Sequence, residues 1–523
     1  MRLVHLIPAG AVLLAVGAVG AAAQFNHPAA STSPASTLPR QVAVTSAARA
    51  CPPALGGGSG TIAAVAGLTG TGTGTGAGAG TGTGTGAGAG AGTGTGAVPK
   101  APAGQAELSS LLPSGLQLKT ITPISETSPG SLSLLTVPAA KPAGKGASAP
   151  TGWSVIASGT MAQAIEAEVA QSSGLAGVRC GEPGSDIWFV GPGQQNGAAQ
   201  IQLDLMNVDS LAASVNVSLI TDAGPVQAGN GSAITVAPHQ TVTESLASAA
   251  GDSSVVAIEV HTSIGRVSAN VSESGSSHGG TTSWLPSAAE PATQLVIPGV
   301  PSSSNAGLFL AVPGSSNAKV NVLAITPQGH YRPFGAQTID LPSQSASYVA
   351  LTPLGGTAAA LEITSNVPVT AAVLVPGSTT NAYTAATGPI VEQAVVAGNT
   401  DGSGYAASVV LSAPAGAARV RLTEIPEGQG TASQGSASQG SASQVMSVQA
   451  GHTLDVPVKA PPGARHGAAF AIVITPLAGS GPLYGARVET QGQSTIVSII
   501  PAASALTTIS LLPVRDTYAA VSP

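Results

Sequence analysis

Apolar residues recur along most of this chain in short runs that suit strands rather than helices. Ile201-Gln-Leu-Asp-Leu205 and Val215-Asn-Val-Ser-Leu-Ile220 alternate apolar with polar residues, the period-two pattern of strands with one wet face. Turn sequences such as Thr221-Asp-Ala-Gly-Pro225 separate the runs, and no sustained helical period lies between them. The pattern predicts an all-β fold of tandem antiparallel β-sandwich (Ig-like) modules. A β-propeller is the rival fold, but its blade repeat of about 40–45 residues is not seen.

An apolar run that ends in a turn marks the start of each predicted module. The clearest is Asp186-Ile-Trp-Phe-Val-Gly-Pro-Gly193, and weaker copies are Leu295-Val-Ile-Pro-Gly299 and Val395-Val-Ala-Gly398. The copies start about 100 residues apart, near the usual size of a domain. They predict three β-sandwich modules after an N-terminal strand block, and the third module carries a low-complexity insert. The ranges are 105–185 for the block, 186–290, 291–390 and 391–523 for the modules, and 428–444 for the insert.

The N-terminal region predicts export followed by a spacer. Residues 1–25 combine Met1-Arg2, an apolar stretch and Ala21-x-Ala23, as in a secretory signal peptide, and the same stretch is long enough for a membrane anchor. Residues 26–104 are rich in Ala, Ser and Pro and then in Gly and Thr, too poor in large apolar side chains to offset the entropy of ordering. We expect a disordered tether there. The expected location is extracytoplasmic, either secreted or anchored through residues 3–23.

The overall composition excludes some classes of partner. Charged residues make up 8 % of the chain, against a typical ~25 %, and the 17 Lys and Arg residues are scattered singly. Nucleic-acid binding needs clustered cations that displace counterions, so we expect no nucleic-acid partner. Val, Ile, Leu and Ala must build the core, which agrees with strands, although codon bias in a GC-rich genome would also raise Ala, Gly, Pro and Thr.

The two cysteines suit an oxidising compartment. Cys51 and Cys180 are the only cysteines, and a pair in an exported chain most often forms a disulfide. The bridge would close a loop of about 130 residues and contribute up to about 5 kcal/mol in the chain-entropy model. Two free thiols or an intermolecular bridge are the alternatives. With two thiols and no nearby histidine pair, no metal site is expected.

Three features of the sequence resemble a known family. They are Cys180-x5-Asp186-x-Trp188-Phe-Val-Gly191, the upstream Cys51-Pro52, and Gly265-Arg-Val-Ser-Ala269. Together they resemble the exported actinobacterial proteins grouped as domain of unknown function 5719. The resemblance runs from Cys51 through the three modules but leaves out the Gly/Thr tract. It implies export behind an N-terminal apolar segment, at most a link to envelope glycans, and no catalytic residues to carry over.

Formal catalytic motifs lie in the wrong context. Gly275-Ser-Ser-His-Gly279 matches a nucleophile elbow, but a Ser/Gly loop surrounds it where a strand and a helix are needed. The eight histidines are isolated. We therefore assign no catalytic, cofactor-binding or metal-binding residue and no cofactor, while two carboxylates could still meet in space. The candidate ligand-contact aromatics are Trp284, Tyr331, Tyr348 and Tyr405, and Trp284, placed in a loop, is expected to be more exposed than Trp188.

These expectations lead to three hypotheses about function. The first is a non-enzymatic exported cell-envelope protein that acts as a structural or interaction module. The alternative is a glycan-binding accessory protein of cell-wall or capsule assembly, which uses the candidate aromatics. The third hypothesis is a hydrolase whose active site lies between modules. The expected partners are an envelope protein or a cell-wall glycan, with membrane contact only through residues 3–23 if that segment stays uncleaved.

Overall fold

The computed structural model describes most of the chain from residue 40 to residue 511. The described ranges are 40–55, 59–68, 101–113, 124–126, 128–137, 151–171, 177–227, 233–275, 282–302, 306–355, 358–377, 380–400, 402, 404–428, 442–465, 467–492 and 495–511. The predicted signal peptide or anchor, most of the predicted tether and most of the insert lie outside them. Two compact units are present, Met1–Val42 with Ile509–Pro523, and Ala43–Thr508. The described residues of the first unit, 40–42 and 509–511, belong to the paired strands β1 (Arg40–Ala43) and β35 (Thr508–Leu511).

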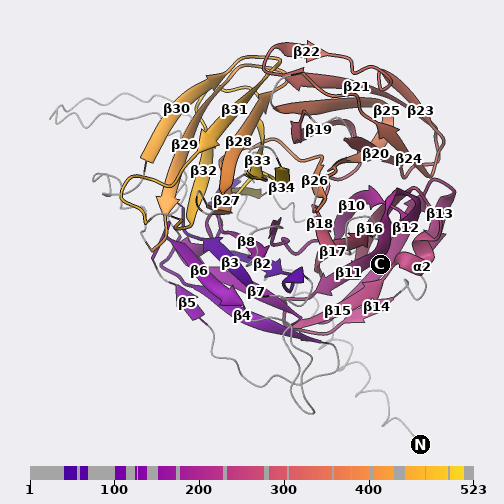
Figure 1. Cartoon of the computed structure of the whole chain (residues 1–523). Helices are drawn as coiled ribbons and strands as arrows, with labels where there is room; N and C mark the ends of the chain where they lie inside the picture. The colour runs from indigo at the N-terminus through magenta and orange to yellow at the C-terminus, as the bar shows by residue number, and fades with distance from the viewer. Residues whose placement is uncertain are drawn as a thin grey trace, which may run out of the picture. The chain divides into compact units, whose positions relative to one another are not determined.

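The larger unit repeats one eight-strand pattern four times, and its strands can be followed by label in Figure 1. In every repeat, strand positions 1, 6, 3 and 4 form one sheet in that order, and positions 5, 2, 7 and 8 form the other. The all-β prediction is thus confirmed. The order differs from that of an immunoglobulin constant domain, in which the first two strands share a sheet.

The strands of the first two modules are as follows. The first module contains β2 (Ser46–Cys51), β3 (Gly60–Val65), β4 (Ala106–Pro113), β5 (Ile124–Glu126), β6 (Leu132–Val137), β7 (Gly152–Ser158), the 3-10 helix η2 (Gly159–Ala162), β8 (Glu166–Gln171) and β9 (Gly177–Arg179). The second contains β10 (Asp186–Pro192), η3 (Gln194–Asn196), β11 (Ala198–Met206), β12 (Ala213–Thr221), β13 (Gly224–Gln227), β14 (Ile234–Val236), β15 (Gln240–Ser245), the short helix α2 (Ala247–Ala250), β16 (Val255–Ile264), β17 (Ser268–Gly275) and β18 (Thr282–Leu285). In the second module, β13 and β14 together take position 4, since both pair with β12.

The third and fourth modules follow the same order. The third contains β19 (Ala292–Pro301), β20 (Gly307–Val312), β21 (Ala318–Thr326), β22 (Gly329–Tyr331), β23 (Thr338–Leu341), β24 (Ser345–Ala350), β25 (Ala358–Val375) and β26 (Ala382–Ala385). The long strand β25 takes positions 6 and 7, because its first half pairs with β19 and β21 and its second half with β20 and β26. The fourth contains β27 (Ala394–Asn399), β28 (Tyr405–Ala413), β29 (Ala418–Pro426), β30 (Ala442–Val448), β31 (His452–Val458), β32 (Phe470–Pro476), β33 (Tyr484–Gln491) and β34 (Thr495–Pro501).

Each module is a sandwich whose two sheets share one apolar core. In the second module, Leu203 and Leu205 of one sheet pack in the same cluster as Val217 and Ile258 of the other. The alternation noted in the sequence explains this packing, since every second side chain of such a strand faces the partner sheet. Corresponding clusters fill the other three modules.

The outer faces of the sheets are packed as well. The core cluster of the second module includes Phe309 of the third, and that of the third includes Ala486 of the fourth. A further cluster joins Val65 of the first module to Val473 of the fourth. A smaller one joins Ala50 to Met206, and two residues of β4 pair in parallel with β15. Each module of the Ala43–Thr508 unit therefore contacts two others.

The first module corrects the prediction for residues 26–104. Strands β2 and β3 are part of its two sheets, so the module begins at Ser46, far before the predicted strand block at 105. Residues 69–100 lie between β3 and β4, which makes the Gly/Thr tract an insertion within this module. A low apolar content shows that a segment builds no core of its own. It does not show whether both ends are fixed in a fold.

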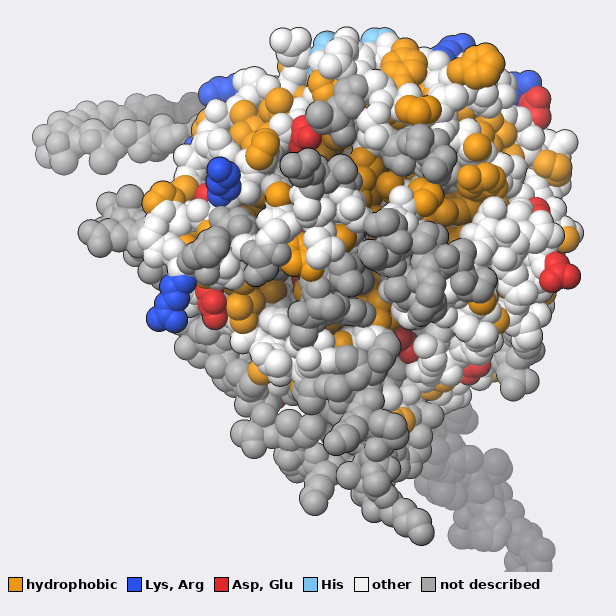
Figure 2. All heavy atoms as spheres, in the orientation of Figure 1, with side chains coloured by type: hydrophobic (Ala, Val, Ile, Leu, Met, Phe, Trp, Pro, Cys, Tyr) orange, Lys and Arg blue, Asp and Glu red, His pale blue; other side chains and the backbone are white. Residues whose placement is uncertain are grey.

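The exterior agrees with the low charge content. On the face drawn in Figure 2, Lys, Arg, Asp and Glu side chains lie singly among uncharged and hydrophobic ones. Among the described residues, no helix has the length and apolar character needed to cross a membrane.

Candidate functional site

A polar cavity lies against the outer face of the sheet β15-β11-β17-β18 in the second module. It has a volume of about 450 Å³ and is called here the sheet-face pocket. Its lining residues are Pro53, Ala54, Leu55, Gln200, Ile201, Gln202, Asp204, Ser245, Ser272, Ser274, Thr282 and Trp284. The volume falls within the roughly 300–1,000 Å³ of ordinary ligand sites.

The pairing of strands explains why polar side chains gather in this pocket. Gln200, Gln202 and Asp204 alternate along β11 with Ile201 and Leu203, which face the sandwich core. Residues opposite each other in adjacent strands share a face of the sheet. The register sets Gln202 opposite Ser245 and Ser272, sets Ser272 opposite Trp284, and sets Gln200 opposite Ser274. Amides, hydroxyls and one carboxyl therefore line one wall, and the segment from Pro53 to Leu55 supplies apolar side chains.

Asp204 is the acidic residue among those that line this pocket. Its side chain is almost fully buried, and the hydroxyl of Thr243 donates a hydrogen bond to Oδ1 over 2.6 Å. Burial raises the pKa of Asp204 to about 6, although the bond from Thr243 acts in the opposite direction. The carboxyl thus changes charge in the mildly acidic range, and no cation pairs with it among the described residues.

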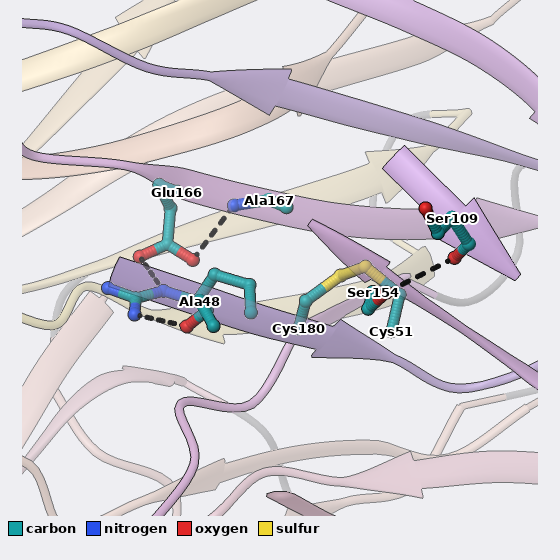
Figure 3. Close-up of a disulfide and its surroundings, with 8 residues drawn as sticks. Ala48, Cys51, Ser109, Ser154, Glu166, Ala167 and Cys180 are labelled. Carbon is teal, nitrogen blue, oxygen red and sulfur yellow. Dashed lines mark hydrogen bonds and ion pairs between the residues drawn. A yellow bond between two sulfur atoms is a disulfide. The ribbon is translucent and has the colours of Figure 1, made fainter. Parts of the chain in front are cut away.

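The predicted disulfide is confirmed and joins the two ends of the first module. Cys51 of β2 is bonded to Cys180, which follows β9, over a separation of 129 residues (Figure 3). Both cysteines are fully buried. Such a bridge is typical of an oxidising, extracytoplasmic compartment.

Buried ion pairs surround the disulfide. Figure 3 shows Glu166 of β8 on the strand next to the disulfide, where one carboxylate oxygen accepts the backbone N–H of Ala167 over 3.1 Å. The other oxygen accepts a short hydrogen bond from Arg179 and lies 3.9 Å from Nε of Arg49. Each of these charges keeps a partner, as burial requires.

A second buried pair connects the first module to the fourth. Nη2 of Arg487 lies 2.9 Å from Oε1 of Glu168, and the other oxygen of Glu168 accepts the backbone N–H of Gly398 over 3.2 Å. Burial raises the pKa of Glu168 to about 7, and this effect outweighs the opposite effect of Arg487. Glu489 also lies within 3.6 Å of Arg487. This cluster fits a structural contact between the two modules better than a ligand site, because Arg487 and Glu168 are almost inaccessible to solvent.

A comparison with protein-family models gives one match, over residues 140–459, to the family described as "Family of unknown function (DUF5719)". The chain belongs to this family. The match confirms the resemblance over residues 140–459, a range that includes Cys180, Trp188 and Gly265-Arg-Val-Ser-Ala269, whereas Cys51-Pro52 lies before it. The comparisons with curated proteins and with solved structures found no significant match.

The aromatic residues proposed for ligand contact are not brought together in this DUF5719 protein. Trp284 lies in strand β18 rather than in a loop and is 6 % exposed, almost as buried as Trp188 at 5 %, so the expectation of an exposed loop residue was wrong. Its ring packs in the core of the first module and still lines the sheet-face pocket. Cross-strand pairing with Ser272 and packing against the neighbouring module bury it.

The three tyrosines lie elsewhere in the DUF5719 chain. Tyr331 of β22 is 38 % exposed, and its hydroxyl accepts the backbone N–H of Gly355 over 3.2 Å. Tyr348 of β24 packs on Phe309 with ring centroids 5.5 Å apart. Tyr405 of β28 accepts a hydrogen bond from Gln491. None of these tyrosines lines the sheet-face pocket.

The catalytic motifs considered in the sequence do not include the polar residues of the sheet-face pocket. The available signal was Gln200-Ile-Gln-Leu-Asp204, a strand whose wet face carries amides and a carboxyl. The rejected formal match to a nucleophile elbow, Gly275-Ser-Ser-His-Gly279, lies mostly outside the described residues. Within the described part of the DUF5719 chain, no group of three His, Cys, Asp or Glu residues is placed to hold a metal ion.

Proposed function

We propose that this chain is a non-enzymatic, exported interaction protein of the cell envelope, in which four sandwich modules form one framework. The observation that carries the proposal is the packing of both faces of the sheets, from module to module, within Ala43–Thr508. Such packing restricts relative motion of the modules and suits presentation of a preformed binding surface. The buried disulfide and the signal-like N-terminus support an extracytoplasmic site of action, with residues 1–25 either cleaved or kept as an anchor.

The sheet-face pocket favours a glycan as the ligand, which is the second candidate function. Its wall of glutamine, serine and threonine side chains offers donors and acceptors together, as a polyhydroxylated compound requires. The apolar wall from Pro53 to Leu55 provides complementary contact area. Asp204 supports binding rather than hydrolysis, since most glycosidases use two carboxyl groups on either side of the bond, and the described lining of this pocket contains one.

The test is a pull-down of purified envelope polysaccharide fractions with the full chain after removal of residues 1–25. Gln200→Ala with Gln202→Ala changes two exposed pocket side chains, and Gln195→Ala changes an exposed glutamine outside the pocket. We expect retention by a polysaccharide fraction, about thirtyfold weaker for the double variant because two hydrogen bonds of about 1 kcal/mol each are lost. The control variant should bind like the wild type.

Retention that is equal for all three proteins would exclude this pocket as the glycan site. Retention by no fraction would remove the glycan-binding function and leave a protein–protein interaction as the function to test. Release of soluble sugar from a retained fraction would contradict the non-enzymatic assignment.

A further inference from the structure

A second cavity is formed by the segments that leave each module. It has a volume of about 470 Å³ and is called here the linker cavity. Its walls include residues 180–187 between the first and second modules, 286–290 between the second and third, 386–388 between the third and fourth, and 499–503 around the end of β34. Trp284 lines this cavity as well as the sheet-face pocket.

The repeated strand order explains why these four segments meet. In each module, a residue of the first strand forms a bridge with a residue just after the last strand. The bridges are Ala50 with Gly181, Trp188 with Ala288, Val296 with Thr387, and Ala394 with Ser504. Each exit segment is thus held beside the first strand of its own module. The cavity is a product of the fold rather than of one loop, and the disulfide lies next to the first of these bridges.

The charges around the linker cavity favour a cation. Three acidic residues line the cavity, namely Glu182, Asp186 and Glu290. The positively charged residue in its described lining is Arg179. Arg179 is already paired with Glu166. Among the neighbouring groups, Arg49 lies 3.3 Å from Glu182, and the ring of His261 lies 3.5 Å from Asp186. Glu290 is exposed and has no ion pair among the described residues. The carboxylates therefore outnumber the guanidinium groups.

A buried acceptor in the wall points in the same direction. Asn270 lines the cavity, the residue is only 3 % exposed, and its Oδ1 has no hydrogen-bond partner in the described structure. An unpaired buried acceptor costs about 1–3 kcal/mol unless a ligand or water donates to it. The nearby Ser268 hydroxyl also has no partner among the described atoms. A ligand that donates N–H or O–H groups would therefore satisfy the unpaired oxygen of Asn270 in this wall.

We propose that the linker cavity binds a small polar molecule that carries a protonated primary amine, such as an amino sugar. The ammonium group is placed near Glu290 and Asp186, and a donor of the same ligand reaches Oδ1 of Asn270. The apolar side of the cavity, from Ile499, Ile500 and Ala288, contacts the carbon skeleton of the ligand. This site is separate from the glycan function proposed for the sheet-face pocket, with which it shares Trp284.

The test is isothermal titration calorimetry at pH 7.5 on the chain that lacks residues 1–25. The three ligands are glucosamine, N-acetylglucosamine and glucose. We expect binding of glucosamine at least tenfold tighter than that of the other two, because acetylation or replacement removes the positive charge. Glu290→Gln should weaken glucosamine binding about tenfold, and Asn270→Ala should weaken it by a similar factor. Asp252→Asn, at an exposed acidic residue outside the cavity, should leave binding unchanged.

Equal affinity for the three sugars, or no binding of any, would overturn the proposal. So would glucosamine binding that Glu290→Gln leaves intact. Because Glu290 is exposed, we expect this substitution to leave the fold unchanged. The Gln200→Ala, Gln202→Ala variant separates the two sites. It should bind glucosamine normally even if it loses the polysaccharide, and the linker cavity can fail this test while the sheet-face pocket still binds.

Discussion

At the residue scale, the least expected feature is the number of carboxyl groups buried in a chain so poor in charge. Glu166, Glu168 and Asp204 are each 5 % exposed or less. Glu166 and Glu168 face guanidinium groups across or within module contacts, whereas Asp204 relies on the hydroxyl of Thr243. Such groups restrict which arrangement of modules is stable, because a shifted interface would leave a charge buried without its partner.

The pH dependence of stability should change when Asp204 is replaced by Asn. The folded pKa of about 6 exceeds the unfolded value of 3.8, so the folded state holds an extra proton between these values. Its stabilising contribution is complete below pH 4 and is lost as the pH rises through 6. We expect Asp204→Asn to unfold at higher denaturant concentration than the wild type at pH 7.5, by roughly 1–3 kcal/mol in free energy, and to match it more closely at pH 4.5.

Urea unfolding at several pH values provides this measurement. Glu168 contributes a dependence of the same sign, extending to about pH 7, and it is present in both proteins, so the difference between them isolates Asp204. A difference that does not vary between pH 4.5 and 7.5 would contradict the raised pKa.

At the element scale, the fold rests on eight strand positions that tolerate very different connections. The connection between positions 2 and 3 runs from Met206 to Ala213 in the second module and from Val65 to Ala106 in the first. In the fourth module, the low-complexity insert extends the connection between β29 and β30 instead. Long surface connections are tolerated because closure entropy grows slowly with their length.

Shortening the Gly/Thr tract should therefore preserve the first module. We expect that replacing residues 69–100 with a six-residue Gly/Ser linker leaves the disulfide intact and raises the free energy of unfolding by about 1–2 kcal/mol, since a shorter connection loses less entropy. Thermal unfolding and a thiol assay under denaturing conditions measure both effects. Loss of folding would instead mean that the tract contributes contacts to the module.

At the scale of the whole Ala43–Thr508 unit, packing from module to module predicts cooperative unfolding. Modules that did not contact one another would unfold independently, each in its own transition. Here, removing one module would expose apolar faces such as that of Val65, Ala471 and Val473, so the others lose stability with it.

Scanning calorimetry of the full chain should show a single transition for the four modules. We expect the van't Hoff enthalpy to be close to the calorimetric one, which is the criterion for two-state behaviour. The matched control is Ile425→Asp, placed in the contact between the first and fourth modules, which should lower the whole transition rather than split off one part. Three or four separate peaks in the wild type would contradict the shared packing.

The sequence by itself determined the local features of this protein. Alternation in Ile201-Gln-Leu-Asp-Leu205 specified a strand with one buried face, the apolar run at Trp188 marked a module, and two cysteines in a chain with a signal-like N-terminus pointed to their bridge. These features depend on neighbours along the chain or on simple counting. Residues 46–65 were missed because half of them are Ala or Gly, whose small side chains carry little hydrophobic pattern.

Only the tertiary structure decided which surfaces meet. Trp284 is buried because a second module covers it, Arg487 and Glu168 pair although they are 319 positions apart in the sequence, and the linker cavity exists because four distant exits converge. Such contacts depend on how the sheets stack, and stacking is set by the complementarity of whole faces rather than by any local run of residues. The sheet-face pocket and the linker cavity, the two proposed ligand sites, both result from that stacking.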